Sequence, residues 1–296
     1  MTQKARILLC GKNGQLGWEF TRTLAPLGDL VALDWPQIDF SRPEELRTQV
    51  LELRPQLIVN ASAYTNVDQA ETEPVLNDLI NHHAVAALAQ AAAQLHAGLV
   101  HISTDYVFDG LKGSPYVEDD PTNPLGRYAA SKRDGELAVQ AHTGTYWTLR
   151  TAWLYSLRQN DFVARVLSWS RQQEILRVVD DQVGSPTWAR MLAQVIGLAL
   201  ATGKDDFYAY MTQTAGVYHL AGDGHASRLA WVQKILELDP QREQQVTRQV
   251  LAAKTADFPT PAQRPLFTAL NCERFRRTFD LTMPTWDTAL TLAMQP

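Results

Sequence analysis

Short apolar runs alternate with helical stretches through the first half of this chain, and this alternation constrains its fold more than any other feature. Each run is continuously apolar, which is typical of strands in a parallel sheet covered by helices on both faces. Repeated strand–helix units imply right-handed crossovers. The sequence therefore predicts an α/β fold built on a Rossmann-like, doubly wound parallel sheet. The predicted strands cover residues 6–10, 30–33, 57–60, 98–103 and 146–150, and the predicted helices cover 15–27, 43–53 and 73–95.

A glycine-rich turn, Gly11-Lys-Asn-Gly14-Gln-Leu-Gly17, joins the first strand to the first helix. The first glycine permits a tight turn, the second lets backbone N–H groups approach a pyrophosphate, and the third allows close helix–strand packing. The helix N-terminus adds partial positive charge for the phosphates. Asp34 ends the second strand, where a carboxylate can hydrogen-bond the adenosine ribose and repel a 2′-phosphate. The turn predicts a nicotinamide dinucleotide site, and Asp34 alone favours NADH over NADPH.

The second half of the chain follows the alternating pattern less closely. A predicted strand at 217–220 and a predicted helix at 228–238 are separated by longer loops. We therefore expect a dinucleotide-binding domain at residues 1–152, to which some later segments return, and a smaller mixed lobe at residues 153–296 that mainly binds the substrate. Residues 109–126 form a long predicted loop, and a loop of this length inside a domain suggests a lid over the site.

Composition excludes several classes of function. The net charge is −5 and the pI is near 5.8, so the chain lacks the basic field that nucleic-acid binding needs. Cys10 and Cys272 are expected to be reduced, packed thiols. The apolar N-terminal run is too short for a signal peptide and the stretch 84–95 is shorter than a bilayer span, so we expect a cytoplasmic protein without membrane contact. His82 and His83 are adjacent, and because neighbouring helix positions do not face each other, no metal site is predicted.

A second group of residues supplies the predicted chemistry. Tyr128 and Lys132 are four positions apart, on one face of a helix. An ammonium that close favours the phenolate and lowers the pKa of Tyr128, which makes the phenol a usable proton donor. Thr104 follows the fourth strand, at the sheet edge where such folds bind ligands. The set predicts carbonyl reduction: Thr104 holds the carbonyl oxygen, Tyr128 protonates it as hydride arrives, and Lys132 also fixes the nicotinamide ribose.

Longer motifs run along nearly the whole chain. They are Asn60-Ala-Ser-Ala-Tyr-Thr-Asn-Val-Asp68, Ser103-Thr-Asp-Tyr-Val-Phe-Asp-Gly110, Arg150-Thr-Ala-Trp153, Asp181-Gln-Val-Gly-Ser-Pro-Thr187 and Arg264-Pro265. With the glycine turn and the Tyr-x-x-x-Lys pair, the chain resembles the extended short-chain dehydrogenases. Within them, it is similar to the family of dTDP-4-dehydrorhamnose reductases.

The resemblance implies an NAD(P)H-dependent reduction of the C4 keto group of dTDP-4-dehydro-6-deoxy-L-mannose to dTDP-L-rhamnose. The cofactor is NADPH or NADH, commonly NADPH, and Mg²⁺ assists some members. The resemblance also implies a small-molecule nucleotide-sugar substrate, with the protein a monomer or homodimer.

The resemblance further assigns roles to matched positions. The implied cofactor contacts are Gly14, Gln15 and Leu16 at the pyrophosphate, Asp34 at the ribose, Asp39 and Phe40 at the adenine, and Ala63, Tyr64 and Thr65 along the rest of the groove. The implied substrate contacts are Thr104, Asp105 and Trp153. Arg264 is a further candidate, because a guanidinium suits bidentate recognition of a sugar diphosphate.

Two alternatives remain open. A nucleotide-sugar epimerase or 4,6-dehydratase of the same superfamily would share the fold. A dehydratase, however, needs an acidic pair beside the threonine, and Tyr106 follows Asp105. A non-catalytic regulatory subunit would keep the fold and lose catalytic residues, whereas Thr104, Tyr128 and Lys132 are all present.

Overall fold

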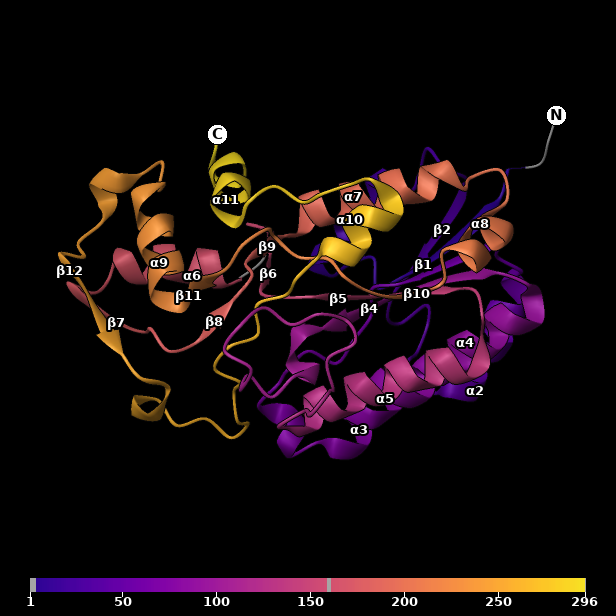
Figure 1. Ribbon diagram of the computed structural model, residues 1–296, viewed down its shortest axis with the longest axis horizontal. Coiled ribbons are helices and arrows are strands. Elements are labelled where there is room, and N and C mark those ends of the chain that lie inside the picture. The colour runs from indigo at the N-terminus through magenta and orange to yellow at the C-terminus, as the bar shows by residue number, and fades with distance from the viewer. Residues whose placement is uncertain (1–3, 159–160, 296) are drawn as a thin grey trace.

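A six-stranded parallel sheet forms the centre of the larger part of the molecule (Figure 1). The computed structural model describes residues 4–158 and 161–295. The strand order is β2-β1-β3-β4-β5-β10. The strands are β1 (Arg6–Cys10), β2 (Asp29–Leu33), β3 (Leu57–Asn60), β4 (Gly98–Thr104), β5 (Tyr146–Thr151) and β10 (Gly216–His219). The predicted doubly wound parallel sheet is confirmed.

Helices cover both faces of this sheet, which explains why its strands are continuously apolar. In β1, Ile7 and Leu9 belong to one hydrophobic core, whereas Leu8 and Cys10 belong to the other. The first face carries α1 (Gln15–Thr23), α7 (Ala189–Thr202), α8 (Phe207–Gln213) and α10 (Glu273–Phe279). The second carries α2 (Pro43–Leu53), α4 (Ala84–Leu95) and α5 (Arg127–His142), with the short α3 (Pro74–Asp78) beside them.

Two predicted helices differ from the observed ones. The helix predicted over 15–27 ends at Thr23, because Pro26 follows closely and the residue before a proline is disfavoured in helical geometry. The helix predicted over 73–95 is divided into α3, the π-helical turn η2 (Leu79–His83) and α4. No local sequence signal marked that wider turn.

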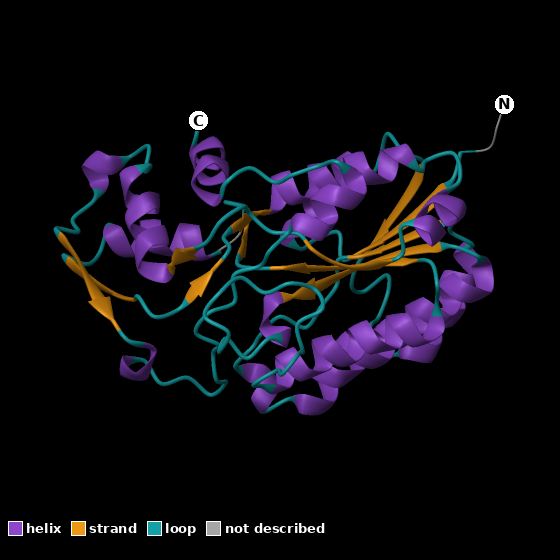
Figure 2. Cartoon of the chain, in the orientation of Figure 1, coloured by secondary structure: helices purple, strands orange, loops and turns teal. Residues whose placement is uncertain are grey.

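A smaller lobe has its own core and short paired strands (Figure 2). Its helices are α6 (Phe162–Ser170), α9 (Arg228–Glu237) and α11 (Trp286–Met294). Its strands are β6 (Leu154–Tyr155), β7 (Ile175–Val179), β8 (Val183–Gly184), β9 (Thr187–Trp188), β11 (Ala226–Ser227) and β12 (Gln249–Ala253). Strand β10 and helix α7, although late in the sequence, belong to the large sheet and its helical layer. The division between residues 152 and 153 stays a prediction.

The long loop at 109–126 is anchored to the core rather than lying over the site. Tyr116 and Glu118 are buried. The backbone of Tyr116 pairs with Ala269 and Asn271, and a carboxylate oxygen of Glu118 accepts a hydrogen bond from the backbone N–H of His219 at 2.9 Å. The predicted lid is therefore wrong for this part of the loop. Among the described residues, no helix is both long enough and apolar enough to cross a membrane.

Candidate active site

A cavity of about 550 Å³ opens at the carboxyl ends of β1, β3, β4 and β5. Strand β2 lies on one side of β1 and β3 lies on the other, so the chain reverses its direction across the sheet after β2. Doubly wound folds bind their ligands at such a switch point. Most of the predicted site residues line this cavity. They are Gly11, Gly14, Gln15, Leu16, Asp34, Ala63, Thr65, Thr104, Asp105, Tyr128, Lys132 and Trp153.

The glycine turn has the geometry that a dinucleotide needs. Gly11 has φ +87°, and a Cβ there would lie 2.8 Å from the backbone nitrogen of Ser62. A Cβ on Gly17 would lie 1.8 Å from the carbonyl oxygen of Gly11, so this glycine lets α1 pack on the turn. At Gly14 the nearest atom would be 3.5 Å away, and no side chain caps the helix start. The turn therefore leaves space and helix N–H groups for a pyrophosphate.

Other predicted cofactor residues are fixed by contacts within the protein. The Asp34 carboxylate accepts hydrogen bonds from the backbone N–H groups of Asn13 and Trp35, both at 2.8 Å. Asp39 accepts hydrogen bonds from Ser41, and Phe40 is buried. These contacts fix the loop after β2 beside Asp34, which lines the cavity. Neither Asp39 nor Phe40 lines the cavity itself.

Tyr64 does not line the cavity, although both of its neighbours do. Its hydroxyl donates a hydrogen bond to Glu73 at 2.7 Å, and burial, followed by the contact with Glu73, raises the pKa of Tyr64 to about 12. Ala63 and Thr65, on either side, face the cavity. The cofactor contact assigned to Tyr64 by resemblance stays a prediction.

The structure brings Thr104, Tyr128 and Lys132 together at one cavity. Thr104 is the last residue of β4, and its Oγ1 accepts a hydrogen bond from the backbone N–H of Tyr106. Tyr128 lies in the first turn of α5. The carboxylate of Glu71 accepts a hydrogen bond from the backbone N–H of Arg127 at 2.8 Å and so caps this helix from η1 (Gln69–Glu71). The end of β4 and the start of α5 are therefore both fixed, and the hydroxyls of Thr104 and Tyr128 lie within hydrogen-bonding range of each other.

The electrostatics of Tyr128 differ from the sequence-based expectation. Burial raises its pKa above the usual tyrosine value, a hydrogen bond with Thr104 acts to lower it, and the charges of Asp105 and Tyr106 act to raise it. The ammonium of Lys132 donates instead to the carbonyl oxygen of Ile102 at 2.7 Å. Burial lowers the pKa of Lys132 to about 8. The prediction that Lys132 lowers the pKa of Tyr128 is wrong in this structure, because desolvation of the phenolate is the larger effect.

Asp105 is a second buried ionisable group beside these hydroxyls. One carboxylate oxygen accepts a hydrogen bond from Thr268 at 2.5 Å and the other from Thr104 at 3.2 Å. Burial raises the pKa of Asp105 to about 6, and the hydrogen bonds and the charge of Arg228 act in the opposite direction. Asp105 can therefore change its charge near neutral pH.

Comparisons with known proteins agree with this geometry. The family model for the RmlD substrate binding domain matches residues 5–296. A dTDP-4-dehydrorhamnose reductase from Burkholderia thailandensis is 39% identical over 293 residues, covering 98% of this chain and 98% of that protein. The enzyme of the same name from Salmonella typhimurium is 40% identical over 288 residues, covering 95% and 94%.

This chain belongs to the dTDP-4-dehydrorhamnose reductase family. A crystal structure of a family member from Bacillus anthracis, in complex with NADP, superposes with a TM-score of 0.87 at 32% identity and covers 97% of this chain and 98% of that one. The family resemblance that the motifs carried is confirmed.

Beside Trp153, one wall of the cavity involves a residue that the sequence analysis missed. The guanidinium carbon of Arg228, at the start of α9, lies 3.6 Å from the ring centroid of Trp153. Trp153 has φ +43°, a strained conformation for a tryptophan, and a Cβ on Gly184 would collide with its ring. The indole is thus held between Gly184 and Arg228. Nothing local in the sequence around Arg228 pointed to this contact.

A second cavity of about 500 Å³ adjoins the site. Tyr106 and Arg228 line it, and these residues contact Tyr128 and Trp153 of the first cavity. Three further arginines line the second cavity, namely Arg165, Arg177 and Arg264. Arg264 also pairs with Asp68 at 2.8 Å. Arg264 therefore lines the adjoining cationic cavity and not the cavity that contains Thr104, Tyr128 and Lys132.

Behind the reductase site, Glu136 and Arg150 form a buried ion pair that sequence reasoning also missed. Their closest atoms are 2.6 Å apart, and their side chains are 2% and 5% exposed. Glu136 follows Lys132 by one turn of α5 and acts to raise the pKa of that lysine. The four-residue spacing of Lys132 and Glu136 could have indicated that these two side chains are neighbours on α5.

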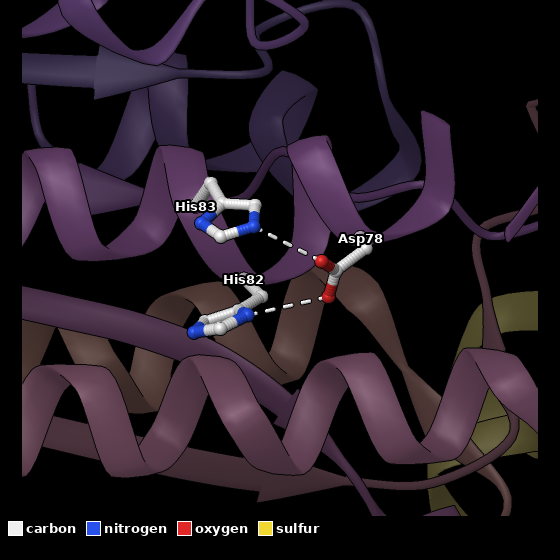
Figure 3. Close-up of side chains that lie close together, drawn as sticks. All are labelled: Asp78, His82 and His83. Atoms are coloured by element: carbon white, nitrogen blue, oxygen red, sulfur yellow. Dashed lines mark hydrogen bonds and ion pairs between the residues drawn. The ribbon is translucent and has the colours of Figure 1, made fainter. Parts of the chain in front are cut away.

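The resemblance implies magnesium, and the sequence predicts no metal site at His82 and His83. In residues 4–158 and 161–295, the group of His, Cys, Asp and Glu side chains that brings three potential ligand atoms within 4.8 Å is Asp78, His82 and His83, outside the cavity, so it does not support the implied magnesium at the site. Two imidazoles do not suit Mg²⁺, which prefers oxygen. The premise that His82 and His83 cannot face each other was wrong, because their rings stack with centroids 4.5 Å apart (Figure 3).

Proposed function

We propose that this protein reduces the C4 keto group of dTDP-4-dehydrorhamnose to give dTDP-L-rhamnose, using a nicotinamide dinucleotide. The observation that carries the proposal is one cavity that contains the glycine turn together with Thr104, Tyr128 and Lys132. Membership of the reductase family supports the same reaction.

The dinucleotide, when bound, supplies the hydride. The chain's own residues handle the proton: the hydroxyls of Thr104 and Tyr128 donate hydrogen bonds to the carbonyl oxygen, and Tyr128 transfers its proton as that oxygen gains charge. The raised pKa of Tyr128 keeps the phenol protonated at neutral pH, as a reduction requires. Lys132, whose ammonium is held by the carbonyl oxygen of Ile102, would hold the cofactor ribose.

The adjoining cavity suits the nucleoside diphosphate. Its arginines offer charge and bidentate donors for the phosphates. Phe162, Trp169 and Phe258 in the same lining offer apolar surface for a base. The sugar would then lie between the two cavities, over Trp153 and beside Asp105.

Either NADPH or NADH serves as the reductant in this proposal. The Bacillus anthracis relative was crystallised with NADP, which supports NADPH, whereas the Asp34 carboxylate disfavours a 2′-phosphate by repulsion. Lys12 lies in the glycine turn and donates to Gln37 at 2.7 Å, so a cation is available near the loop after β2. A cytoplasmic location and a monomeric or dimeric state stay predictions.

The test is incubation of the purified protein with dTDP-4-dehydrorhamnose and either NADPH or NADH, with the absorbance of the reduced nicotinamide recorded and the product identified. We expect one equivalent of cofactor to be consumed for each dTDP-L-rhamnose formed. Isomerised or dehydrated product without cofactor consumption would support the epimerase or dehydratase alternative. No turnover with either cofactor, together with stoichiometric capture of a partner enzyme, would support the regulatory alternative.

A further inference from the structure

Asp78, His82 and His83 form a surface cluster where α3 passes through η2 into α4 (Figure 3). The Nδ1 atom of His82 lies 3.2 Å from one carboxylate oxygen of Asp78, and the Nε2 atom of His83 lies 3.1 Å from the other. All three potential ligand atoms lie within 4.8 Å of one another. The carboxylate thus faces both imidazoles at once.

The π-helical turn creates this arrangement. In an ordinary α-helix the residue four positions after Asp78 lies near it, and the residue five positions after it has turned away. A π-helical turn is wider, with i→i+5 hydrogen bonds, so His82 and His83 flank Asp78 on the same side. Such single wide turns occur frequently at functional sites.

We propose that Asp78, His82 and His83 bind one divalent transition-metal ion of the Zn²⁺ class. Zn²⁺ takes imidazole nitrogen and carboxylate oxygen at about 2.0–2.2 Å, so in a tetrahedral site neighbouring ligand atoms lie roughly 3.3 Å apart. The two nitrogen–oxygen distances are already close to that separation. Mg²⁺ and Ca²⁺ are excluded, because they take oxygen ligands.

The cluster is accessible and its backbone is firmly held. The three side chains are 43%, 31% and 52% exposed, in sequence order. Asn77 of α3 and Asn81 of η2 are buried and bond to Ser131 of α5. A cavity of about 420 Å³ beside Asp78 and His83 leaves room for water to complete the coordination. The ligands therefore need only small side-chain rotations to close on a metal.

The proposal is tested by titrating the untagged, chelator-treated protein with ZnCl₂ in a calorimeter, since a polyhistidine tag would itself bind zinc. We expect one site per chain and a zinc-dependent rise in Tm. His82→Ala and His83→Ala should each weaken binding by at least about tenfold. Asp78→Asn should also weaken it, because the amide cannot supply the negative charge. His142→Ala is the matched control, since His142 is also exposed on a helix but lies outside the cluster.

The variants alter side chains that are partly exposed, so their Tm without zinc should stay close to that of the parent protein. Saturable binding that survives in the His82→Ala/His83→Ala double variant would overturn the proposal. Absence of saturable zinc binding below about 100 μM in the parent protein would overturn it as well. Binding lost in the cluster variants and kept in His142→Ala would support it.

Discussion

The ammonium of Lys132 donates a hydrogen bond to the carbonyl oxygen of Ile102 at 2.7 Å. Ile102 lies in β4, two residues before Thr104, which ends that strand. A single strand therefore orients the lysine through its main chain and presents the threonine hydroxyl at its end. Lys132 and Tyr128 both come from α5, so the same lysine contact also ties that helix to the strand that presents Thr104.

The pKa of Lys132 predicts an alkaline limit to activity. Because this pKa is lowered to about 8, the ammonium is present below that pH and lost as the pH rises through it. If the charged form holds the cofactor ribose, kcat/KM should fall about tenfold per pH unit above that value. The measurement is a pH profile at subsaturating cofactor. Lys132→Met should be weakly active and lack this alkaline limb, and a wild-type profile flat to pH 10 would contradict the assignment.

The buried Asp105 carboxylate is expected to lower the free energy of unfolding at neutral pH. Its folded-state pKa is raised to about 6, so protonation favours the folded protein, and this contribution is lost as the pH rises from about 4 through 6. Asp105→Asn should therefore raise the free energy of unfolding at pH 7 by about 1–3 kcal/mol, with a smaller gain near pH 4. Urea unfolding at both pH values measures this. Activity should fall in the same variant.

Asp109 provides a control of opposite sign. Hydrogen bonds from Leu111, Asn123 and Tyr116 lower its pKa, so its carboxylate stabilises the folded protein at neutral pH. Asp109→Asn should lower stability at pH 7. If both aspartate variants shifted stability in the same direction, the electrostatic explanation would fail.

Removing only one partner of the buried ion pair between Glu136 and Arg150 should lower the free energy of unfolding strongly. Arg150→Met leaves a buried carboxylate without its partner, and such a loss typically costs about 3–5 kcal/mol. The double variant Glu136→Leu/Arg150→Met should be much closer to wild type. Lys234→Met breaks the exposed pair with Glu237 and should cost less than about 1 kcal/mol. Urea midpoints compare the three, and equal losses for the buried and exposed single variants would contradict the reasoning.

Two variants can separate the ion pair that Arg264 forms from its proposed contact with the substrate. It pairs with Asp68 and lines the second cavity. If it binds the sugar diphosphate, Arg264→Ala should raise the KM for substrate by about tenfold or more while kcat changes little. Asp68→Asn breaks the same ion pair and keeps the guanidinium, so its KM should not rise. An unchanged KM in Arg264→Ala would remove Arg264 from the substrate site.

Local spacing explains which features could be predicted from the sequence. The glycine turn, the strand that ends at Thr104 and the Tyr128–Lys132 pair each depend on a few consecutive residues, and all meet at one cavity. The same spacing could not predict the direction of the Lys132 side chain, because helical periodicity gives only the face. For this reason the sequence predicted a lowered pKa for Tyr128, whereas the structure gives a raised one.

Long-range contacts were not predictable in the same way. Thr268 reaches Asp105 across 163 positions, and Arg228 of α9 reaches Trp153, which lies between β5 and β6. The sequence there carries no pairing pattern that would link such distant residues. The π-helical turn at Leu79–His83 was missed for a different reason, since its residues fit an ordinary helix equally well.

The most direct test of the account is hydride transfer in Tyr128→Phe, measured in a single turnover with saturating dTDP-4-dehydrorhamnose and reduced cofactor. Tyr106→Phe is the matched control, because that ring packs edge-on against Tyr128 with centroids 6.2 Å apart. We expect Tyr128→Phe to slow the step by about 10²–10⁴-fold with cofactor affinity retained. Tyr106→Phe should affect mainly the KM. A Tyr128→Phe variant that reduces the sugar at nearly the wild-type rate would contradict the central claim.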